Sequence, residues 1–361
     1  MKTTRRILQC IIKIIFLICE KINGRYKYIK SNIVLPKEPV LFLSNHQLNL
    51  DAVRLRAHNN RRIAFVVHEE VYRNRLYRWI GNNILDMICR GTCKRDISYI
   101  KELFRAKALG LSIGIYPEGG INYFNQSIPF DISLAKLAKK LDMPIVIVNI
   151  NGGTFVKPRW AKYKGHNKVE YGYKKLITKD MLHQLSVENL HKELQNDLYV
   201  NDYDWQRETL SKVNRKCPTL YLKRALFVCP ECRALHTLSF SDNTVCCKSC
   251  HSILGLDKYD FVTGSTQVKD LVAWDNLQYN VLQNKLQNTN ESEILLQTNA
   301  YCMEANINQY FNNTKTFSKI ILTPKELTIV TPTQTKKYST QDIFKIYVEF
   351  YNTLQFSHQD T

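Results

Sequence analysis

The chain has 361 residues, of which 44% are hydrophobic, and a formal net charge of +19. Its modest Gly and Pro content excludes fibrous and wholly disordered classes, and its length is that of two or three domains. So large a positive charge attracts polyanions, which are either nucleic acids or the anionic surface of a membrane, and charge alone does not choose between them.

The chain opens on an apolar run of about 13 residues that contains Lys13, whereas a membrane-spanning helix needs about 20. A secretory signal peptide is one alternative, but no small-residue cleavage site follows the run. A helix buried in the protein is another. We expect residues 1–30 to form an uncleaved helix that lies in a membrane interface, because basic residues flank the run. These residues are Lys2, Arg5, Arg6, Lys21, Arg25, Lys27 and Lys30.

Short apolar runs alternate with helical stretches between residues 39 and 175. This alternation predicts an α/β domain over residues 31–200, with a largely parallel sheet flanked by helices. The expected strands are 40–44, 63–67, 84–89, 112–116, 144–150 and 169–173, and the expected helices are 50–58, 69–80, 96–109 and 131–141. The polar stretch 201–216 reads as a connector.

The stretch NHQLNLD places His46 just after the first expected strand and Asp51 where a helix begins, with Asn49 as a candidate N-cap. Functional sites of open α/β sheets lie at the carboxyl ends of strands. Because the five-residue step spans a loop and a helix start, the two side chains can meet. Asp51 would then fix the tautomer of His46, which would act as a general base. Alternatively, His46 caps the helix and Asp51 is a solvated carboxylate.

Three further stretches end expected strands: ILDMICR with Arg90, GIYPEGG with Glu118 and Gly119, and PIVIVNINGG. In this order, the four stretches resemble the sequence blocks of the lysophosphatidic acid acyltransferase family, the 1-acyl-sn-glycerol-3-phosphate O-acyltransferases. The resemblance spans residues 25–200.

The resemblance implies that an acyl group passes from a thioester, acyl-CoA or acyl-ACP, to a hydroxyl of a lysophospholipid, without a covalent acyl-enzyme. It implies that His46 and Asp51 are catalytic and that Arg90, Glu118 and Gly119 hold the acceptor. It also implies an acyltransferase-type mixed sheet and an enzyme of phospholipid synthesis.

The third block departs from the family pattern. The family usually reads E-G-T-R-S where this chain has EGGIN at residues 118–122, so an arginine that helps to bind a phosphate is missing. Arg90, Lys94 and Arg95 are candidate replacements, or the acceptor lacks a phosphomonoester. A lipid-binding homologue without activity is the alternative.

Five of the cysteines crowd into residues 229–250. Cys229 and Cys232, and then Cys247 and Cys250, form two C-x-x-C pairs about 14 residues apart, a spacing typical of a tetrahedral Zn²⁺ site. Four thiolates close such a site, which predicts a structural zinc ribbon over residues 217–260. Cys246 or His251 are alternative ligands.

Zinc ribbons often bind nucleic acid, which makes a nucleic-acid-binding protein the rival hypothesis. This ribbon has few basic residues, and the chain shows no RNP-type motif, so nucleic acid is not the expected partner. Residues 261–361 are expected to be β-rich, with a vague likeness to a pleckstrin-homology-like barrel. Together these features predict a peripheral enzyme on the cytoplasmic side of the cell membrane, with lipids as partners.

Overall fold

The computed structural model describes residues 2–68, 71, 75–90, 97–303, 315–349 and 353–358. The chain divides into two compact units, Met1–Asp275 and Asn276–Thr361. The first unit contains the expected catalytic residues and the four cysteines of the C-x-x-C pairs.

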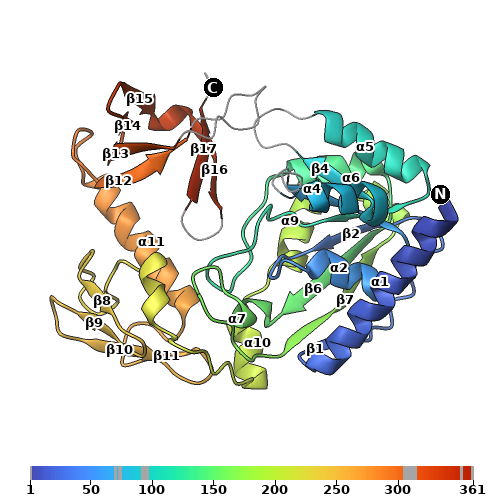
Figure 1. Cartoon of the computed structure of the whole chain (residues 1–361), viewed down its shortest axis with the longest axis horizontal. Helices are drawn as coiled ribbons and strands as arrows, with labels where there is room; N and C mark the ends of the chain where they lie inside the picture. Colours follow the sequence, from blue (N-terminus) through green and yellow to red (C-terminus); the bar gives the residue numbers. More distant parts are fainter. Residues whose placement is uncertain are drawn as a thin grey trace. The chain divides into compact units, whose positions relative to one another are not determined.

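A seven-stranded sheet forms the centre of the first unit (Figure 1), in the order β1-β7-β6-β2-β5-β3-β4. The five strands from β6 to β4 run parallel, while β7 is antiparallel to β6 and parallel to β1. The α/β prediction with a parallel-rich sheet is confirmed. The strands are β1 (Tyr26–Ile29), β2 (Leu41–Ser44), β3 (Ile63–His68), β4 (Met87–Arg90), β5 (Ser112–Ile115), β6 (Ile145–Asn151) and β7 (Val169–Ile177).

Helices pack on both faces of the sheet. Alternate residues of each buried strand point to opposite faces, so β2, β3 and β6 each contribute to both apolar clusters. Leu41 and Leu43 of β2 pack among the helices of one face, and Phe42 packs with Leu55 of α2 on the other. The helices of the first face are α5 (Ile97–Ala108), α6 (Ser133–Leu141), α8 (Lys179–Gln184) and α9 (Val187–Leu198), and α2 spans Asp51–Ala57.

Helix α1 (Lys2–Asn23) lies beside α2 (Figure 1). It ends at Gly24, which has φ +65° and donates its N–H to the carbonyl of Glu20 at 3.0 Å, a common glycine helix end. Strand β1 follows, so the expectation of one helix over residues 1–30 is too long. Among the helices that the structure describes, none is both long and apolar enough to cross a bilayer.

The polar stretch 201–216 is not a mere connector, because it contains helix α10 (Asp202–Thr209). Asn201 caps this helix by accepting the N–H of Tyr203 at 3.0 Å. Asp202, Tyr203 and Gln206 are buried, so α10 belongs to the core of the first unit. The expectation failed because these polar side chains pair inside the protein.

The cysteine-rich module is a four-stranded antiparallel sheet of β8 (Leu238–Phe240), β9 (Val245–Cys247), β10 (Ile253–Leu256) and β11 (Val262–Thr263). Arg215 joins it to the rest of the first unit. The Arg215 guanidinium contacts Asp260 at 2.6 Å, with both side chains buried, and donates to the carbonyl of Phe155 at 2.9 Å. The Tyr203 hydroxyl also donates to the Asp260 carbonyl.

The second unit is β-rich, as expected. Its strands form a four-stranded antiparallel sheet and a two-stranded hairpin. They are β12 (Leu296–Cys302), β13 (Thr316–Leu322), β14 (Glu326–Val330), β15 (Thr335–Ser339), β16 (Ile343–Glu349) and β17 (Thr353–His358). Helix α11 (Leu271–Gln287) begins in the first unit and enters the second.

Candidate active site

The loop that follows β2 is tied to the neighbouring strand β6. Asn45 donates from Nδ2 to the carbonyl of Ile150 and accepts the Ile150 N–H at Oδ1, each at 2.8 Å. Asn45 is buried, so these bonds are shielded from water. They fix the backbone from which the next residue, His46, projects.

The structure brings His46 and Asp51 together. Nδ1 of His46 lies 3.1 Å from Oδ2 of Asp51. The same oxygen accepts the N–H groups of Gln47 at 2.9 Å and Leu48 at 2.8 Å. Asn49 is not the helix cap: α2 begins at Asp51 without a side-chain cap, and the Asp51 carboxylate closes the loop instead.

This contact orients the imidazole. Because a carboxylate only accepts hydrogen bonds, Nδ1 carries the hydrogen and Nε2 carries the lone pair. Within the described part of the chain, Nε2 has no hydrogen-bond partner, and the His46 side chain is 22% exposed. The ring lies 4.5 Å from the ring of Tyr116, centroid to centroid. The arrangement suits a base that receives a proton from the solvent side.

Behind Asp51 lies a buried network that sequence reasoning missed. Nη1 of Arg54 donates to Oδ1 of Asp51 at 3.1 Å, and Nε donates to Glu20 in α1 at 2.5 Å. The guanidinium also lies 3.8 Å from the centroid of the Tyr26 ring. One signal was available: Glu20 is the first acidic residue of the chain and follows an apolar run.

Glu118 joins two loops at the site. Its Oε1 accepts the N–H of His46 at 2.8 Å, and its Oε2 accepts the N–H of Ile128 at 2.9 Å. Burial raises the pKa of the Glu118 carboxyl to about 7, although both N–H bonds oppose the rise. Gly119 follows with φ +72°, a conformation that favours glycine. Glu118 therefore holds the backbone of His46 in place. Acceptor binding by Glu118 and Gly119 stays a prediction.

The raised pKa of Glu118 predicts a pH-dependent stability. Between its ordinary value of 4.5 and about 7, the folded chain binds more protons than the unfolded chain. Its contribution to the free energy of unfolding is therefore complete below pH 4.5 and falls by about 3 kcal/mol as the pH rises through 7. In denaturant titrations across this range, wild type should lose stability relative to Glu118→Gln. Parallel pH curves for the two proteins would refute this assignment.

Arg90 does not lie beside His46. It ends β4, the edge strand, which is three strands from β2 and hence about 14 Å away at the level of the sheet. Its guanidinium lies 5.6 Å from the centroid of the Tyr99 ring. Lys94 and Arg95 lie outside the described residues. Acceptor binding by Arg90 stays a prediction.

A different cation lies at the third block. Nη1 of Arg159 donates to the carbonyl of Ile121 at 3.0 Å, and its guanidinium lies 5.3 Å from the centroid of the Tyr123 ring. Ile121 occupies the position at which the resembled family has its arginine. Sequence reasoning missed Arg159 because 38 residues separate the two positions.

The Gly–Gly turn after β6 is also fitted to the His46 loop. Oε1 of Gln47 accepts the Gly153 N–H at 2.7 Å, and a side chain at Gly153 would collide with Gln47. Oδ1 of Asp202 accepts from Nε2 of Gln47 at 2.9 Å and from the Gly152 N–H at 2.8 Å. Burial raises the pKa of Asp202 to about 6. Helix α10 thus supports the loop from behind.

A cavity of about 380 Å³ opens beside this loop. Its lining includes Asn45, which precedes His46 in the chain, and Glu118, which accepts the His46 N–H. Much of the remaining lining is apolar, as a bound acyl chain requires. Its apolar residues include Ile128, Pro129, Phe130, Leu198 and Tyr199.

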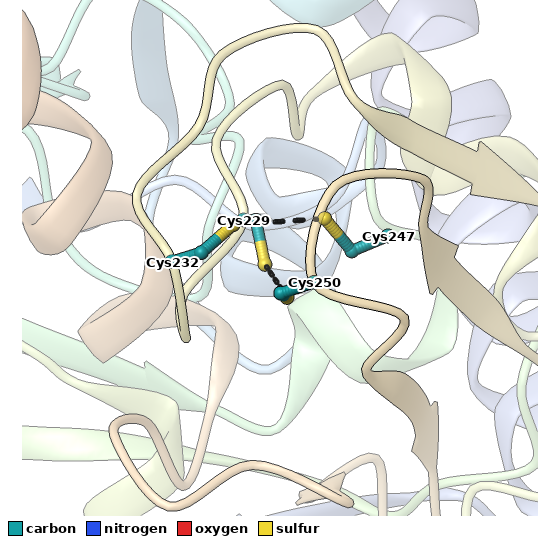
Figure 2. A group of neighbouring side chains, drawn as sticks. All are labelled: Cys229, Cys232, Cys247 and Cys250. Carbon is teal, nitrogen blue, oxygen red and sulfur yellow. Dashed lines mark hydrogen bonds between the residues drawn. The ribbon is translucent and has the colours of Figure 1, made fainter.

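A second candidate site in the first unit consists of four cysteines whose sulfurs lie close together (Figure 2). They are the predicted residues Cys229, Cys232, Cys247 and Cys250. The sulfurs of Cys229 and Cys250, and those of Cys232 and Cys247, are each 3.7 Å apart. Four Zn–S bonds of about 2.3 Å in a tetrahedron separate the sulfurs by about 3.8 Å. The spacing fits a metal held by four thiolates and is far too long for disulfides.

The surroundings of Cys247 favour a thiolate. Burial tends to raise its pKa, but hydrogen bonds from Thr237 and from the N–H groups of Cys250 and Ser249 bring the pKa of Cys247 down to about 6. Cys246 and His251, the alternative ligands that the sequence left open, are not part of this group of four cysteines.

Comparison with known proteins finds one family model and one solved structure that are similar to part of the chain. Residues 25–151 match the family model described as Acyltransferase. The crystal structure of the 1-acyl-sn-glycerophosphate (LPA) acyltransferase PlsC from Thermotoga maritima is similar at 16% identity and a TM-score of 0.43. The match covers 57% of this chain and 82% of that one. No curated protein matches the chain.

Proposed function

We propose that residues 25–151, which match the family model described as Acyltransferase, form the catalytic domain of an O-acyltransferase of lipid metabolism. The enzyme transfers an acyl group from acyl-CoA or acyl-ACP to a hydroxyl of a lysophospholipid, with 1-acylglycerol-3-phosphate as the first acceptor to test. The observation that carries the proposal is the His46–Asp51 pair at the carboxyl end of β2, with Nε2 of His46 open to a substrate.

The reaction uses His46 as a general base. Nε2 takes the proton of the acceptor hydroxyl while the hydroxyl oxygen attacks the thioester carbonyl. The carbon–sulfur bond then breaks, and the sulfur leaves as a thiol after taking that proton from His46. Asp51 stabilises the imidazolium that exists between the two steps. The products are an ester and the free thiol of CoA or ACP.

The two ends of the acceptor require different surroundings. The cavity beside Asn45 and Glu118 suits an acyl chain, since its remaining walls are largely apolar. Arg159, at the third block, supplies the positive charge that a phosphate needs there, and Arg90 is a second candidate. An acceptor with a phosphate therefore remains compatible with the missing block arginine.

The orientation of α1 supports attachment to a membrane. Two of its charged residues face the protein: Nζ of Lys13 donates to the Asn59 carbonyl and to Asn60 Oδ1, each at 3.0 Å, and Glu20 pairs with Arg54. Six of its apolar residues are exposed, whereas a surface helix usually turns such residues to the core. The exposed apolar stripe consists of Leu8, Ile11, Ile14, Ile15, Ile18 and Ile22.

A stripe of this kind fits the boundary between lipid headgroups and acyl chains. Lys21 lies in the last turn of the helix, and the other basic residues of the segment suit anionic lipid. We therefore propose a peripheral enzyme on the cytoplasmic side of the cell membrane, where a lysophospholipid reaches the site from the bilayer.

The stripe gives a direct test of membrane binding. Changing Ile15 and Ile18, which are 55% and 53% exposed, to Glu should lower binding to anionic vesicles about a hundredfold or more, because two apolar contacts are lost and two repelled charges are gained. Vesicle pelleting measures the change. The matched control is Ile253→Glu, at a position 64% exposed in the cysteine module. Equal binding by the double variant and the control would exclude α1 as the anchor.

We also propose that the four cysteines hold one structural Zn²⁺. Their sulfur spacing and their closed set of four thiolates support this assignment, since such a set leaves no position for substrate. The metal thus stabilises the module and takes no part in acyl transfer.

The deciding experiment is acyl transfer by the purified full chain, with acyl-CoA and acyl-ACP as donors and a panel of lysophospholipid acceptors with and without a phosphomonoester. Transfer to at least one acceptor is expected. Good vesicle binding without transfer to any acceptor would indicate the inactive lipid-binding homologue. Tight, salt-dependent oligonucleotide binding without vesicle binding would indicate the nucleic-acid rival.

A further inference from the structure

The His46–Asp51 pair is the end of a longer row of charges that reaches α1. Asp51 pairs with Arg54, Arg54 pairs with Glu20, and Glu20 pairs with Nε2 of His58 at 3.1 Å. The side chains of Asp51, Arg54 and Glu20 are 0%, 3% and 9% exposed. Water therefore screens this row poorly, and a charge at one end is felt at the other.

Each charge of the row changes the balance between the neutral imidazole and the imidazolium of His46. The negative charge of Asp51 stabilises the imidazolium, and the positive charge of Arg54 offsets part of that stabilisation. The negative charge of Glu20 in turn offsets part of the positive charge of Arg54. Because α1 holds Glu20, seating of this helix against α2 completes the row.

We propose that Arg54 and Glu20 are positioning residues that set the basicity of His46, and that Glu20 makes this setting depend on the seating of α1. The inference rests on the proposed function of His46 as the general base. Three consecutive contacts between charged groups link α1, the helix proposed to face the membrane, to the His46 imidazole. The link requires no change in fold.

Among the other titratable groups that face the row, the tyrosines supply no charge. Burial raises the pKa of Tyr116, beside His46, and of Tyr171, beside Arg54, well above the ordinary value, so both stay neutral. Tyr26 faces Arg54 through its ring. Glu118 accepts the His46 N–H, and burial raises the pKa of its carboxyl to about 7, so its charge also acts on His46 and is present in wild type and in every variant.

Two substitutions separate charge from structure, because they act in opposite directions. Glu20→Gln removes a buried negative charge that offsets part of the charge of Arg54, which disfavours the imidazolium. Arg54→Gln leaves the charge of Asp51 without an offset, which favours it. The acid limb of kcat/KM should move to lower pH by about half a unit or more in Glu20→Gln, and to higher pH by a similar amount in Arg54→Gln.

The double variant Glu20→Gln/Arg54→Gln removes one charge of each sign and should return the acid limb to nearly its wild-type position. Arg54→Lys keeps the charge and should leave the limb in place while lowering the plateau rate. The matched control is Glu102→Gln, the same change in an exposed ion pair of α5, which should leave the profile unchanged.

The experiment measures pH profiles of the full chain on vesicles for wild type and all variants. It also follows the protonation of the His46 ring by NMR, which does not require activity. Rates that fall without opposite shifts would overturn the inference and leave Arg54 and Glu20 as structural residues. If Arg54→Gln fails to fold, the double variant and Glu20→Gln decide. An inactive wild type would refute the proposed function, whereas the NMR shifts would still test the charge row.

Discussion

Replacing His46 with alanine is expected to lower kcat about a thousandfold, since a general base contributes about 10²–10⁴-fold to such a rate. The loss should fall on kcat rather than on KM, because Nε2 acts on the proton in transit and not on substrate binding. Steady-state acyl transfer to the best acceptor measures the change. Vesicle binding should be unaffected, because His46 is not part of the exposed apolar stripe of α1 that we propose as the membrane anchor.

The companion variant Asp51→Asn tests the orientation of the ring. The amide can donate to Nδ1, which would place the hydrogen on Nε2 and leave no lone pair for the acceptor hydroxyl. Its rate should be nearly as low as that of His46→Ala, and the double variant should lose little more. Wild-type rates in Asp51→Asn would refute the pairing as a catalytic device, whatever the 3.1 Å contact suggests.

Removal of zinc is expected to have the largest effect on folding. Structural zinc sites contribute about 10–16 kcal/mol of apparent binding energy, which is comparable with the whole stability of a domain. Metal analysis should find one Zn²⁺ per chain, and Cys232→Ser should lose it. Limited proteolysis should then cut within residues 217–263, which should resist cleavage in wild type. The Asp260 contacts with Arg215 and Tyr203 would be lost as well, so the melting temperature of the first unit should fall.

Cys246→Ser is the matched control, because Cys246 neighbours a ligand but lies outside the group of four. It should keep the metal and the protection from proteolysis. A zinc-free wild type with an intact, protease-resistant module would contradict the metal assignment.

The parts of the fold that follow local pattern could be predicted. The expected strands at 40–44, 63–67, 112–116 and 144–150 lie within a residue or so of β2, β3, β5 and β6. Their apolar runs are buried on both faces and bounded by polar or glycine residues, which makes them visible in a sequence. The parallel direction followed from the alternation with helices.

The parts that depend on distant partners could not be predicted. Strand β1 is short, half exposed and paired only with β7, so it has no strong pattern of its own. Helix α10 appeared too polar to be buried because its partners, such as Gln47 for Asp202, lie far away in sequence. At the site, the meeting of His46 and Asp51 depended on one loop and could be predicted. The roles of Arg54 and Glu20 depended on the docking of α1.

Strand β1 also has a consequence for the order of folding. Lys27 of β1 pairs with Glu170 of β7 across 143 residues, and contacts that close so long a loop form late. A ribosome adds about 5–20 residues per second, so roughly 7–30 seconds separate the synthesis of the two strands. During that interval, α1 is already synthesised, with its exposed apolar stripe, whereas the sheet still lacks β7. If α1 binds lipid as proposed, it can do so before the sheet that carries His46 is complete.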